Sequence, residues 1–344
     1  MKIDLIERVR REGNPLIDGT KATWVWRGVR APQLIGDFTL WELGRPLEMK
    51  QSAPQAWTTA LDFPLDAYIE YAFVRNGEHV DDPLNPRHVS NGLGATNHFF
   101  AMPEAVSTKL FRPIKGFPRG EVTSHVITGD MIAGGKRTVH LFHPPVAEPR
   151  PLLIVFDGQD YLKRVHLPHI VDNLIGLGKL HPVAMVLIDN GSSARIAELA
   201  SSESMLVFLL NKVLPLAQAE LNLTAPGEWG LLGASLGGLM SLYSALRFPE
   251  IFNRVLSQSG SFTLHGRDSL VFDLTRARYN PALKIWMDVG RFEYLLEANQ
   301  RMAEVLRASG YDVVYRETNG GHNYTVWRDD VERGLMALFG VRFL

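Results

Sequence analysis

The pattern of hydrophobic and polar positions changes about one third of the way along the chain. Between residues 20 and 102, short segments that alternate apolar and polar side chains are separated by turn formers, as in ATWVWRG (22–28) and AYIEYAFVRNG (67–77). Alternation with a period of two is typical of half-buried strands, and several short strands in succession are typical of a β-sandwich. A segment rich in Pro, Gly and basic residues follows at 112–121 and predicts a linker. We therefore expect a small all-β sandwich domain in residues 1–117.

Continuous apolar runs replace the alternation after residue 118. Such runs, separated by helical segments, predict the strands of a parallel sheet that is covered on both faces. The runs are LLIVFD (152–157), VAMVLID (183–189), EWGLLG (228–233), RVLSQSG (254–260) and LKIWMDVG (283–290). Before them, EVTSHVIT (121–128) and KRTVHLFHPP (136–145) predict a leading antiparallel pair. Residues 118–344 are thus expected to form an α/β domain with a mostly parallel sheet.

Composition narrows the choice of partners and of compartment. The formal net charge of -1 gives no reason to expect nucleic acid or an anionic membrane as a partner. The chain has no cysteine, which excludes disulfides, thiolate catalysis and cysteine-ligated zinc and fits a reducing compartment. Residues 1–19 predict a short amphipathic helix rather than a signal peptide, and no apolar run approaches the roughly 20 residues of a membrane-spanning helix. We therefore expect a cytoplasmic protein.

The strongest motif is GASLG at 233–237, between the predicted strand at 228–233 and a helical pattern. It matches G-x-S-x-G, the strand-to-helix turn that carries the nucleophile of α/β-hydrolases. Glycines are needed two residues before and after the serine because side chains there would collide in so sharp a turn. Ser235 is therefore the candidate nucleophile, although a glycine-eased turn with an incidental serine remains the simpler alternative.

A serine nucleophile needs a base, and the base needs an orienting acid. In this fold the order along the chain is serine, acid, histidine. His322 follows the strand-like run DVVYRE (312–317), and Gly320 and Gly321 leave its loop free to turn. Two candidate acids lie between Ser235 and His322 in the sequence: Asp288 inside the last predicted strand, and Glu293 after a turn. We favour Glu293 as the orienting acid. A glutamate in the first turn of a helix is also favoured by the helix dipole, so a purely structural role for it stays open.

The oxyanion hole is expected to combine two backbone N–H groups. One is that of Leu236, the residue after the nucleophile. The other comes from the loop after the strand at 152–157, where Gln159 is the first choice and Asp160 the second.

These segments resemble the enterochelin esterases, which hydrolyse the trilactone backbone of catecholate siderophores in the cytoplasm. The resemblance extends over most of the chain and includes the segments DDPLNPRHVSNGLGATNHFFAMP, VLIDNGSSARIAEL, LLGASLGGLMSLYSALRFPEIFNRVLSQSGSF, GRFEYLLEANQ and GGHNYTVWR. It implies an α/β-hydrolase preceded by an immunoglobulin-like domain, with Ser235, His322 and Glu293 as the triad. It implies no metal or organic cofactor, because the iron belongs to the substrate.

The resemblance also implies residues that contact the substrate, namely Arg195, Glu198, Arg87, His88 and Trp327. For Arg195 and Glu198, an i,i+3 ion pair at a helix start is an equally open interpretation. Residues 33–86 also resemble the immunoglobulin-like module of glycogen-branching enzymes, in which an exposed Trp41 could stack on a sugar. Core packing is the simpler interpretation of Trp41.

Three functions are therefore compared. The first is a serine esterase acting on a small-molecule substrate, a ferric catecholate siderophore. The second is a carbohydrate esterase that removes feruloyl or acetyl groups while its first domain binds glycan. The third is a silent siderophore-binding protein, against which the complete set of triad candidates argues. The sequence does not fix the oligomeric state.

Overall fold

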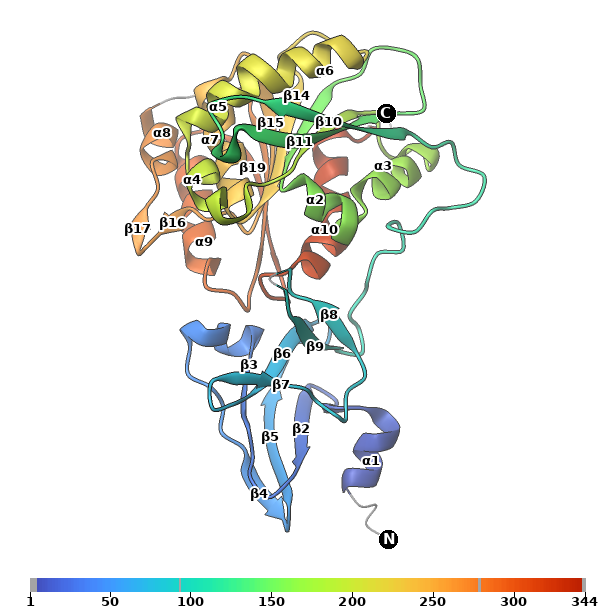
Figure 1. The fold of residues 1–344 in the computed structure, drawn as a ribbon, viewed down its shortest axis with the longest axis vertical. Helices are drawn as coiled ribbons and strands as arrows, with labels where there is room; N and C mark the ends of the chain where they lie inside the picture. Colours follow the sequence, from blue (N-terminus) through green and yellow to red (C-terminus); the bar gives the residue numbers. More distant parts are fainter. Residues whose placement is uncertain (1–4, 93, 278–279, 342–344) are drawn as a thin grey trace. The chain divides into compact units, whose positions relative to one another are not determined.

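The computed structural model describes residues 5–92, 94–277 and 280–341 (Figure 1). The chain divides into two compact units. The first consists of the chain up to Ser107 together with two short later segments, Gly290–Tyr294 and Glu317–Val326. The second consists of Thr108–Val289, Leu295–Arg316 and the chain from Trp327 onward. No local pattern in the sequence marks these two later segments as part of the first unit.

The first unit is built mainly from antiparallel strands. One sheet has the order β1 (Leu16–Asp18), β2 (Lys21–Arg27), β5 (Ala56–Asp62), β4 (Lys50–Ala53). The other has the order β3 (Gln33–Gly36), β6 (Tyr68–Arg75), β9 (Thr96–Ala101), β8 (His88–Ser90), with β7 (Glu78–Val80) also paired to β6. The amphipathic segment at the start forms α1 (Leu5–Glu12).

An aromatic cluster forms the core of this unit. Trp24 is fully buried, and its ring lies 5.1 to 6.1 Å from four other rings. These belong to Phe38, Phe63, Tyr71 and Phe100. Trp24 and Tyr71 lie on strands of different sheets, so their contact joins the two sheets. The predicted all-β sandwich at the N-terminal end is confirmed.

The described part of the second unit contains an eight-stranded sheet. Its order is β10 (Glu121–Thr128), β11 (Lys136–His143), β13 (Ala184–Ile188), β12 (Leu152–Phe156), β14 (Trp229–Ala234), β15 (Phe252–Gln258), β18 (Lys284–Gly290), β19 (Asp312–Thr318). The pairings from β13 through β18 are parallel, and those of β10 with β11 and of β11 with β13 are antiparallel. The predicted parallel core and leading antiparallel pair are both present. The predicted domain boundary at 117/118 falls in the connection between β9 and β10.

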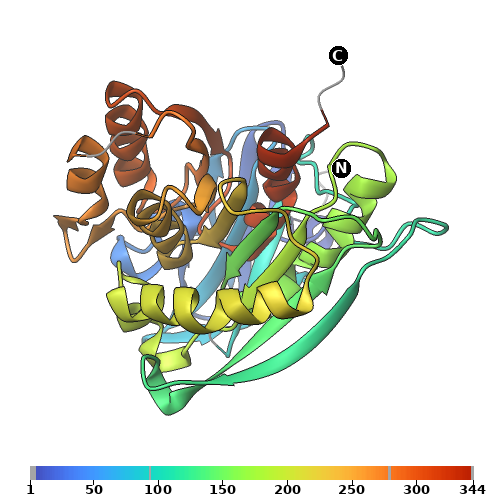
Figure 2. The same ribbon diagram turned by 90° about the horizontal axis from the view of Figure 1, so that it is seen from above.

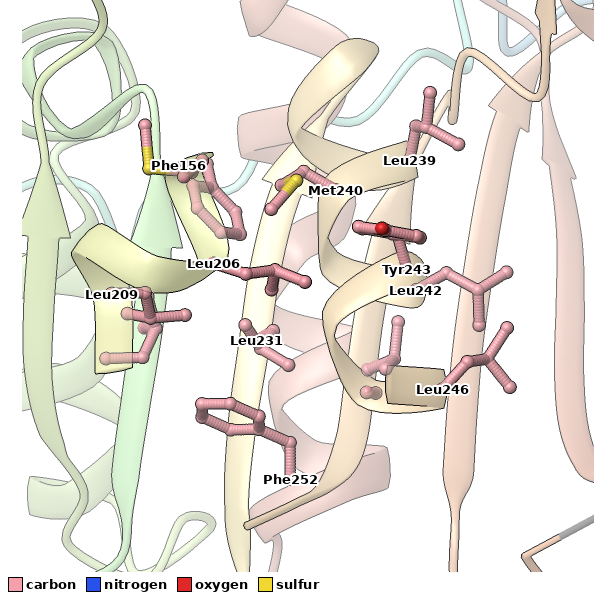
Figure 3. Packing of buried hydrophobic residues seen from close by; sticks show 14 of the residues in the cluster. Phe156, Leu206, Leu209, Leu231, Leu239, Met240, Leu242, Tyr243, Leu246 and Phe252 are labelled. Carbon is pink, nitrogen blue, oxygen red and sulfur yellow. The ribbon is translucent and has the colours of Figure 1, made fainter. Parts of the chain in front are cut away.

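Helices cover both faces of this sheet (Figure 2). Successive strand residues point to opposite faces, so Val255 packs in the cluster around α7 (Leu236–Arg247), whereas Leu256 lies beside Gly334 of α10 (Tyr324–Phe339). Figure 3 shows Leu239, Met240 and Leu246 of α7 among the buried side chains. The other helices are α2 (Gly158–Asp160), α3 (Leu167–Gly176), α4 (Arg195–Leu199), α5 (Glu203–Phe208), α6 (Leu214–Glu220), α8 (Val271–Ala277) and α9 (Leu296–Ala308), with a small hairpin of β16 (Thr263–Leu264) and β17 (Arg267–Asp268).

Two short helical stretches other than α-helices are relevant to the sites below. A 3-10 helix at Asp37–Thr39 follows β3, and a second one at Trp41–Leu43 comes directly after it. Within the described ranges, no single helix is long and apolar enough to cross a membrane. One pair of helical segments, Ser192–Leu199 with Glu203–Glu220, reaches that length and composition only across a 95° bend.

Candidate active site

Ser235 occupies a sharp turn between β14 and α7. Its backbone has φ +58° and ψ −120°, a conformation that non-glycine residues rarely adopt and that stores strain. The turn closes only with glycine at position 233, because a Cβ there would lie 2.4 Å from the carbonyl carbon of Gly237. A Cβ on Gly237 would instead lie 3.2 Å from Asp157 Oδ2, a tight contact outside the turn. The predicted collision is therefore present two residues before the serine, but it is not found two residues after it.

Hydrogen bonds hold the turn at Ser235 on both sides. The Ser235 N–H donates to Gln258 O at 2.8 Å, and the Ser261 N–H donates to Ser235 O at 3.0 Å. The two hydroxyl oxygens of Ser235 and Ser261 are 3.1 Å apart. Leu236 is the first residue of α7, so its N–H has no carbonyl one turn earlier within the helix and is available to a ligand.

Glu293 and His322 lie together in the first unit. His322 Nδ1 is hydrogen-bonded to Glu293 Oε2, and the other carboxyl oxygen of Glu293 accepts the Gly290 N–H at 2.9 Å. The side chain of Glu293 is fully buried, whereas that of His322 is 19% exposed. The ring of Tyr294 lies 5.3 Å from the imidazole. Of the two acids that the sequence offered, Glu293 is therefore the one that the structure pairs with the histidine.

Asp288, the other acid, belongs to a buried polar network in the second unit. Its Oδ2 accepts from Trp286 Nε1 at 2.9 Å and lies 3.3 Å from Gln258 Nε2. Gln258 in turn accepts from the hydroxyl of Tyr161 at 2.9 Å. Burial, with the nearby charge of Asp288, raises the pKa of Tyr161 well above its usual value, so this hydroxyl remains a donor. The network fixes the ends of β15 and β18.

The loop after β12 carries Gln159, the expected second oxyanion donor. Its side-chain Oε1 accepts the Asn190 N–H at 3.0 Å, which anchors the loop to the end of β13. Gly158 packs against β13 so closely that a Cβ would lie 2.6 Å from the Leu187 carbonyl carbon. Asp160, the second choice, lies 3.5 Å from Arg164, and burial raises the pKa of its carboxyl.

Arg195 and Glu198 do not pair with each other. Arg195 donates two hydrogen bonds, of 2.6 and 2.7 Å, to the buried carboxylate of Asp157, and its Nη2 lies 3.4 Å from Ala234 O. Glu198 is 7% exposed and forms an ion pair of 2.6 Å with Arg137. The i,i+3 interpretation is therefore wrong, and the carboxylate of Glu198 is committed to the interior. Asp157 and Arg137 were missed in the sequence, although the position of Asp157 at the end of a buried strand was a usable signal.

The other predicted substrate contacts occupy varied positions. Trp327 is only 4% exposed and donates its indole N–H to Ser259 Oγ at 2.9 Å, so it serves the core of the second unit. In the first unit, Arg87 is half-buried and donates to Asn85 Oδ1 at 3.1 Å, whereas His88 is exposed on β8. Trp41, considered as a sugar platform, is half-buried and donates to Asp37 Oδ1 at 2.9 Å.

A model of the protein family described as "Putative esterase" matches residues 131–338. The chain belongs to this esterase family. An iron(III) enterobactin esterase of Escherichia coli K12 is 29% identical to this chain over 273 residues, which is 76% of this chain and 67% of the relative. An iron(III) enterobactin esterase of Dickeya dadantii is 32% identical over 207 residues, 55% of this chain and 48% of that relative. The resemblance to enterochelin esterases is confirmed, and the protein is a carboxylic ester hydrolase.

Solved structures confirm the fold. The ferric enterobactin esterase of Salmonella typhimurium superposes with a TM-score of 0.78 at 23% identity, over 92% of this chain and 93% of that one. A ferulic acid esterase matches with a TM-score of 0.55 at 15% identity over 65% of this chain. The fold class, an α/β-hydrolase preceded by an immunoglobulin-like β-sandwich, is thus established for the esterase.

Proposed function

We propose that this esterase hydrolyses the trilactone ester bonds of catecholate siderophores such as ferric enterobactin, so that the iron is released. The observation that carries the proposal is the identity of 28 to 29% to two enterobactin esterases over 76% of the chain. A salmochelin esterase of Escherichia coli, 26% identical over 247 residues, supports the same substrate class. The iron enters as part of the substrate.

Ser235, His322 and Glu293 form the catalytic triad of this proposal. His322 takes the proton from the Ser235 hydroxyl through Nε2 as the oxygen attacks a lactone carbonyl, and then delivers it to the leaving alkoxide. Glu293 accepts from Nδ1–H, which keeps Nε2 free as the base and stabilises the imidazolium. The N–H groups of Leu236 and Gln159 hold the negative oxygen. Water, with His322 again as the base, then attacks the carbonyl of the acyl-enzyme, which releases the acid and frees Ser235.

The bidentate contact of Arg195 with Asp157 supports a second role for the arginine, besides its predicted contact with the substrate. Its guanidinium ties the loop after β12 to the end of β14, the two segments that supply Gln159 and Ser235. We propose that Arg195 holds the loop after β12, which carries Gln159, in a fixed position relative to Ser235. Arg195, Arg87 and His88 remain predicted substrate contacts.

We further propose that the reaction takes place in the cytoplasm. The absence of cysteine from the whole sequence fits a reducing compartment. Cell fractionation with an antibody against the native chain tests this placement, and recovery of the esterase with periplasmic markers contradicts it.

Competing substrates test the function. The purified esterase is incubated separately with ferric enterobactin, iron-free enterobactin and methyl ferulate, and the products are followed by mass spectrometry. We expect linear and then monomeric dihydroxybenzoylserine from enterobactin, and loss of turnover with retained binding in Ser235→Ala. Intact trilactone beside hydrolysed ferulate refutes the proposal and favours the carbohydrate esterase, whose fold is shared by the ferulic acid esterases. Turnover that persists in Ser235→Ala refutes the mechanism alone.

A further inference from the structure

Asp37 is a buried acid of the sandwich that the proposed mechanism does not use. It is 1% exposed and lies directly after β3, at the start of a short 3-10 helix. Its Oδ1 accepts the indole N–H of Trp41 at 2.9 Å, and its Oδ2 accepts the Glu70 N–H at 2.8 Å. Leu40 and Trp41, the residues that close this turn, both have positive φ, of 56° and 57°. The protein therefore maintains a strained segment around one buried carboxyl group.

The charged groups that face Asp37 belong to β6 and to the loop that carries the proposed triad acid. They are Glu70, 3% exposed, and Glu293, 4% exposed. Glu293 has His322 as its partner, and Glu70 accepts from Asn97 at 2.8 Å. Burial, and next the charge of Glu70, raise the pKa of Asp37 well above its usual range, which favours the protonated form of its carboxyl group.

The carboxyl group of Asp37 also fills the space beside the histidine loop. A Cβ placed on Gly321 would lie 2.1 Å from both Cγ and Oδ1 of Asp37, and no atom of another residue comes closer. Gly321 immediately precedes His322. The glycine that the sequence analysis attributed to loop freedom is therefore required by contact with an acid from the other end of the chain.

Further contacts bind the segments Gly290–Tyr294 and Glu317–Val326 to the sandwich. The Tyr68 N–H donates to Asn319 O at 3.1 Å, and Asn319 Nδ2 donates to Asp66 Oδ1 at 2.6 Å. On the other segment, the ring of Phe292 lies 5.6 Å from that of Phe63. The segments that carry Glu293 and His322 are thus packed on the sandwich at several points, and Asp37 is the contact nearest to the histidine in sequence.

We infer that Asp37 is a positioning residue for catalysis: its carboxyl group, pressed against Gly321, holds the loop of His322 so that the imidazole stays aligned with Glu293. The inference rests on the proposed role of His322 as the base. It gives the N-terminal sandwich a part in the chemistry, independent of any contact with the substrate.

The test is a size exchange between the two touching positions. Hydrolysis of p-nitrophenyl butyrate is measured for Asp37→Ala, Gly321→Ala and the double variant, with melting temperatures recorded for each. Displacement of a catalytic group by about 1 Å costs up to about a hundredfold, so we expect kcat to fall between about tenfold and a hundredfold in each single variant, with little change in KM. The added methyl fits where the carboxyl was removed, so the double variant should recover about tenfold over Gly321→Ala.

Two further variants separate positioning from stability. Asp37→Asn keeps the volume beside Gly321 but leaves one buried N–H without an acceptor, so we expect a lower melting temperature with kcat within about threefold of the parent. Asp82→Asn is the matched control, a buried sandwich acid that binds Tyr71 and Asn14 instead of the loop, and it should behave likewise.

The outcomes distinguish this inference from the proposed function. Unchanged kcat in Gly321→Ala, or a double variant whose loss is the product of the two single losses, overturns the role of Asp37. The same holds if Asp82→Asn lowers kcat as much as Asp37→Ala does. If Asp37→Ala does not fold, Gly321→Ala alone decides. Ser235→Ala and His322→Ala are run in parallel, and if they retain activity it is the proposed triad that fails.

Discussion

Replacing Glu293 by Gln should remove nearly all activity, for a reason that follows from the hydrogen bonds of its two oxygens. Oε1 accepts the Gly290 N–H at 2.9 Å, so the amide oxygen of Gln must occupy that position. The NH2 group then faces His322 Nδ1 and donates to it. This forces the ring proton onto Nε2, the nitrogen that must accept the serine proton, and the imidazole is held in the wrong tautomer.

The expected loss is large. A wrong tautomer in a serine-histidine-acid triad lowers kcat by about 10⁴, which is about 5 kcal/mol of transition-state stabilisation. KM should change little, because Glu293 is buried and the substitution preserves its size. The assay is hydrolysis of p-nitrophenyl butyrate under steady-state conditions, with circular dichroism to confirm folding.

Asp288→Asn is the matched control, since Asp288 is also a buried acid after the nucleophile but bonds to Trp286 and Gln258 rather than to a histidine. We expect its kcat to stay within about tenfold of the parent. The reasoning is refuted if Glu293→Gln retains more than about a tenth of the activity, or if Asp288→Asn is the more damaging change.

The remaining predictions concern stability. The raised pKa of Asp37 means that the native state keeps this proton at a pH where the unfolded chain has lost it, so the stabilising effect is complete below about pH 4 and is lost as pH rises toward the native pKa. In that window the unfolding free energy of the parent, measured by urea titration, should fall by about 1.4 kcal/mol per pH unit relative to Asp37→Asn. Parallel curves for the two proteins contradict this. Arg137→Ala leaves Glu198 buried without its cation and should lower the unfolding free energy by about 3–5 kcal/mol. Arg164→Ala breaks the more exposed pair with Asp160 and should lower it by under about 1 kcal/mol, and equal losses contradict a buried ion pair at Glu198. Gly233→Ala should prevent closure of the Ser235 turn and lower the melting temperature as well as kcat, and a fully active variant contradicts the steric account.

The sheet was predictable because its signal is local. Each apolar run of the sequence became a strand within about two residues, as with LLIVFD and β12 at Leu152–Phe156. The turn at Ser235 was predictable for the same reason, since Gly233, the glycine that permits it, lies two residues away. Strand periodicity and turn sterics act over a few residues and therefore leave a local pattern.

The contacts between distant segments left no such pattern. Trp327 was expected to meet substrate, but its neighbours along the chain do not show that Ser259 lies beside its indole nitrogen. The pairing of Arg195 with Asp157 joins the start of α4 to the end of β12, and the pairing of Asp37 with Gly321 spans most of the chain. A pattern of residue types records which face is apolar, but the partner of a buried charge is set by the tertiary fold.

The segment that carries His322 also sets when the enzyme becomes competent during its synthesis. Tyr68 binds Asn319, and at about 5–20 residues per second the ribosome needs roughly 10–50 s to proceed from one to the other. Throughout that interval the nascent sandwich lacks two segments of its own folded unit. A polypeptide that stops short of residue 322 lacks its proposed base, so we expect esterase activity only in chains that extend past this segment.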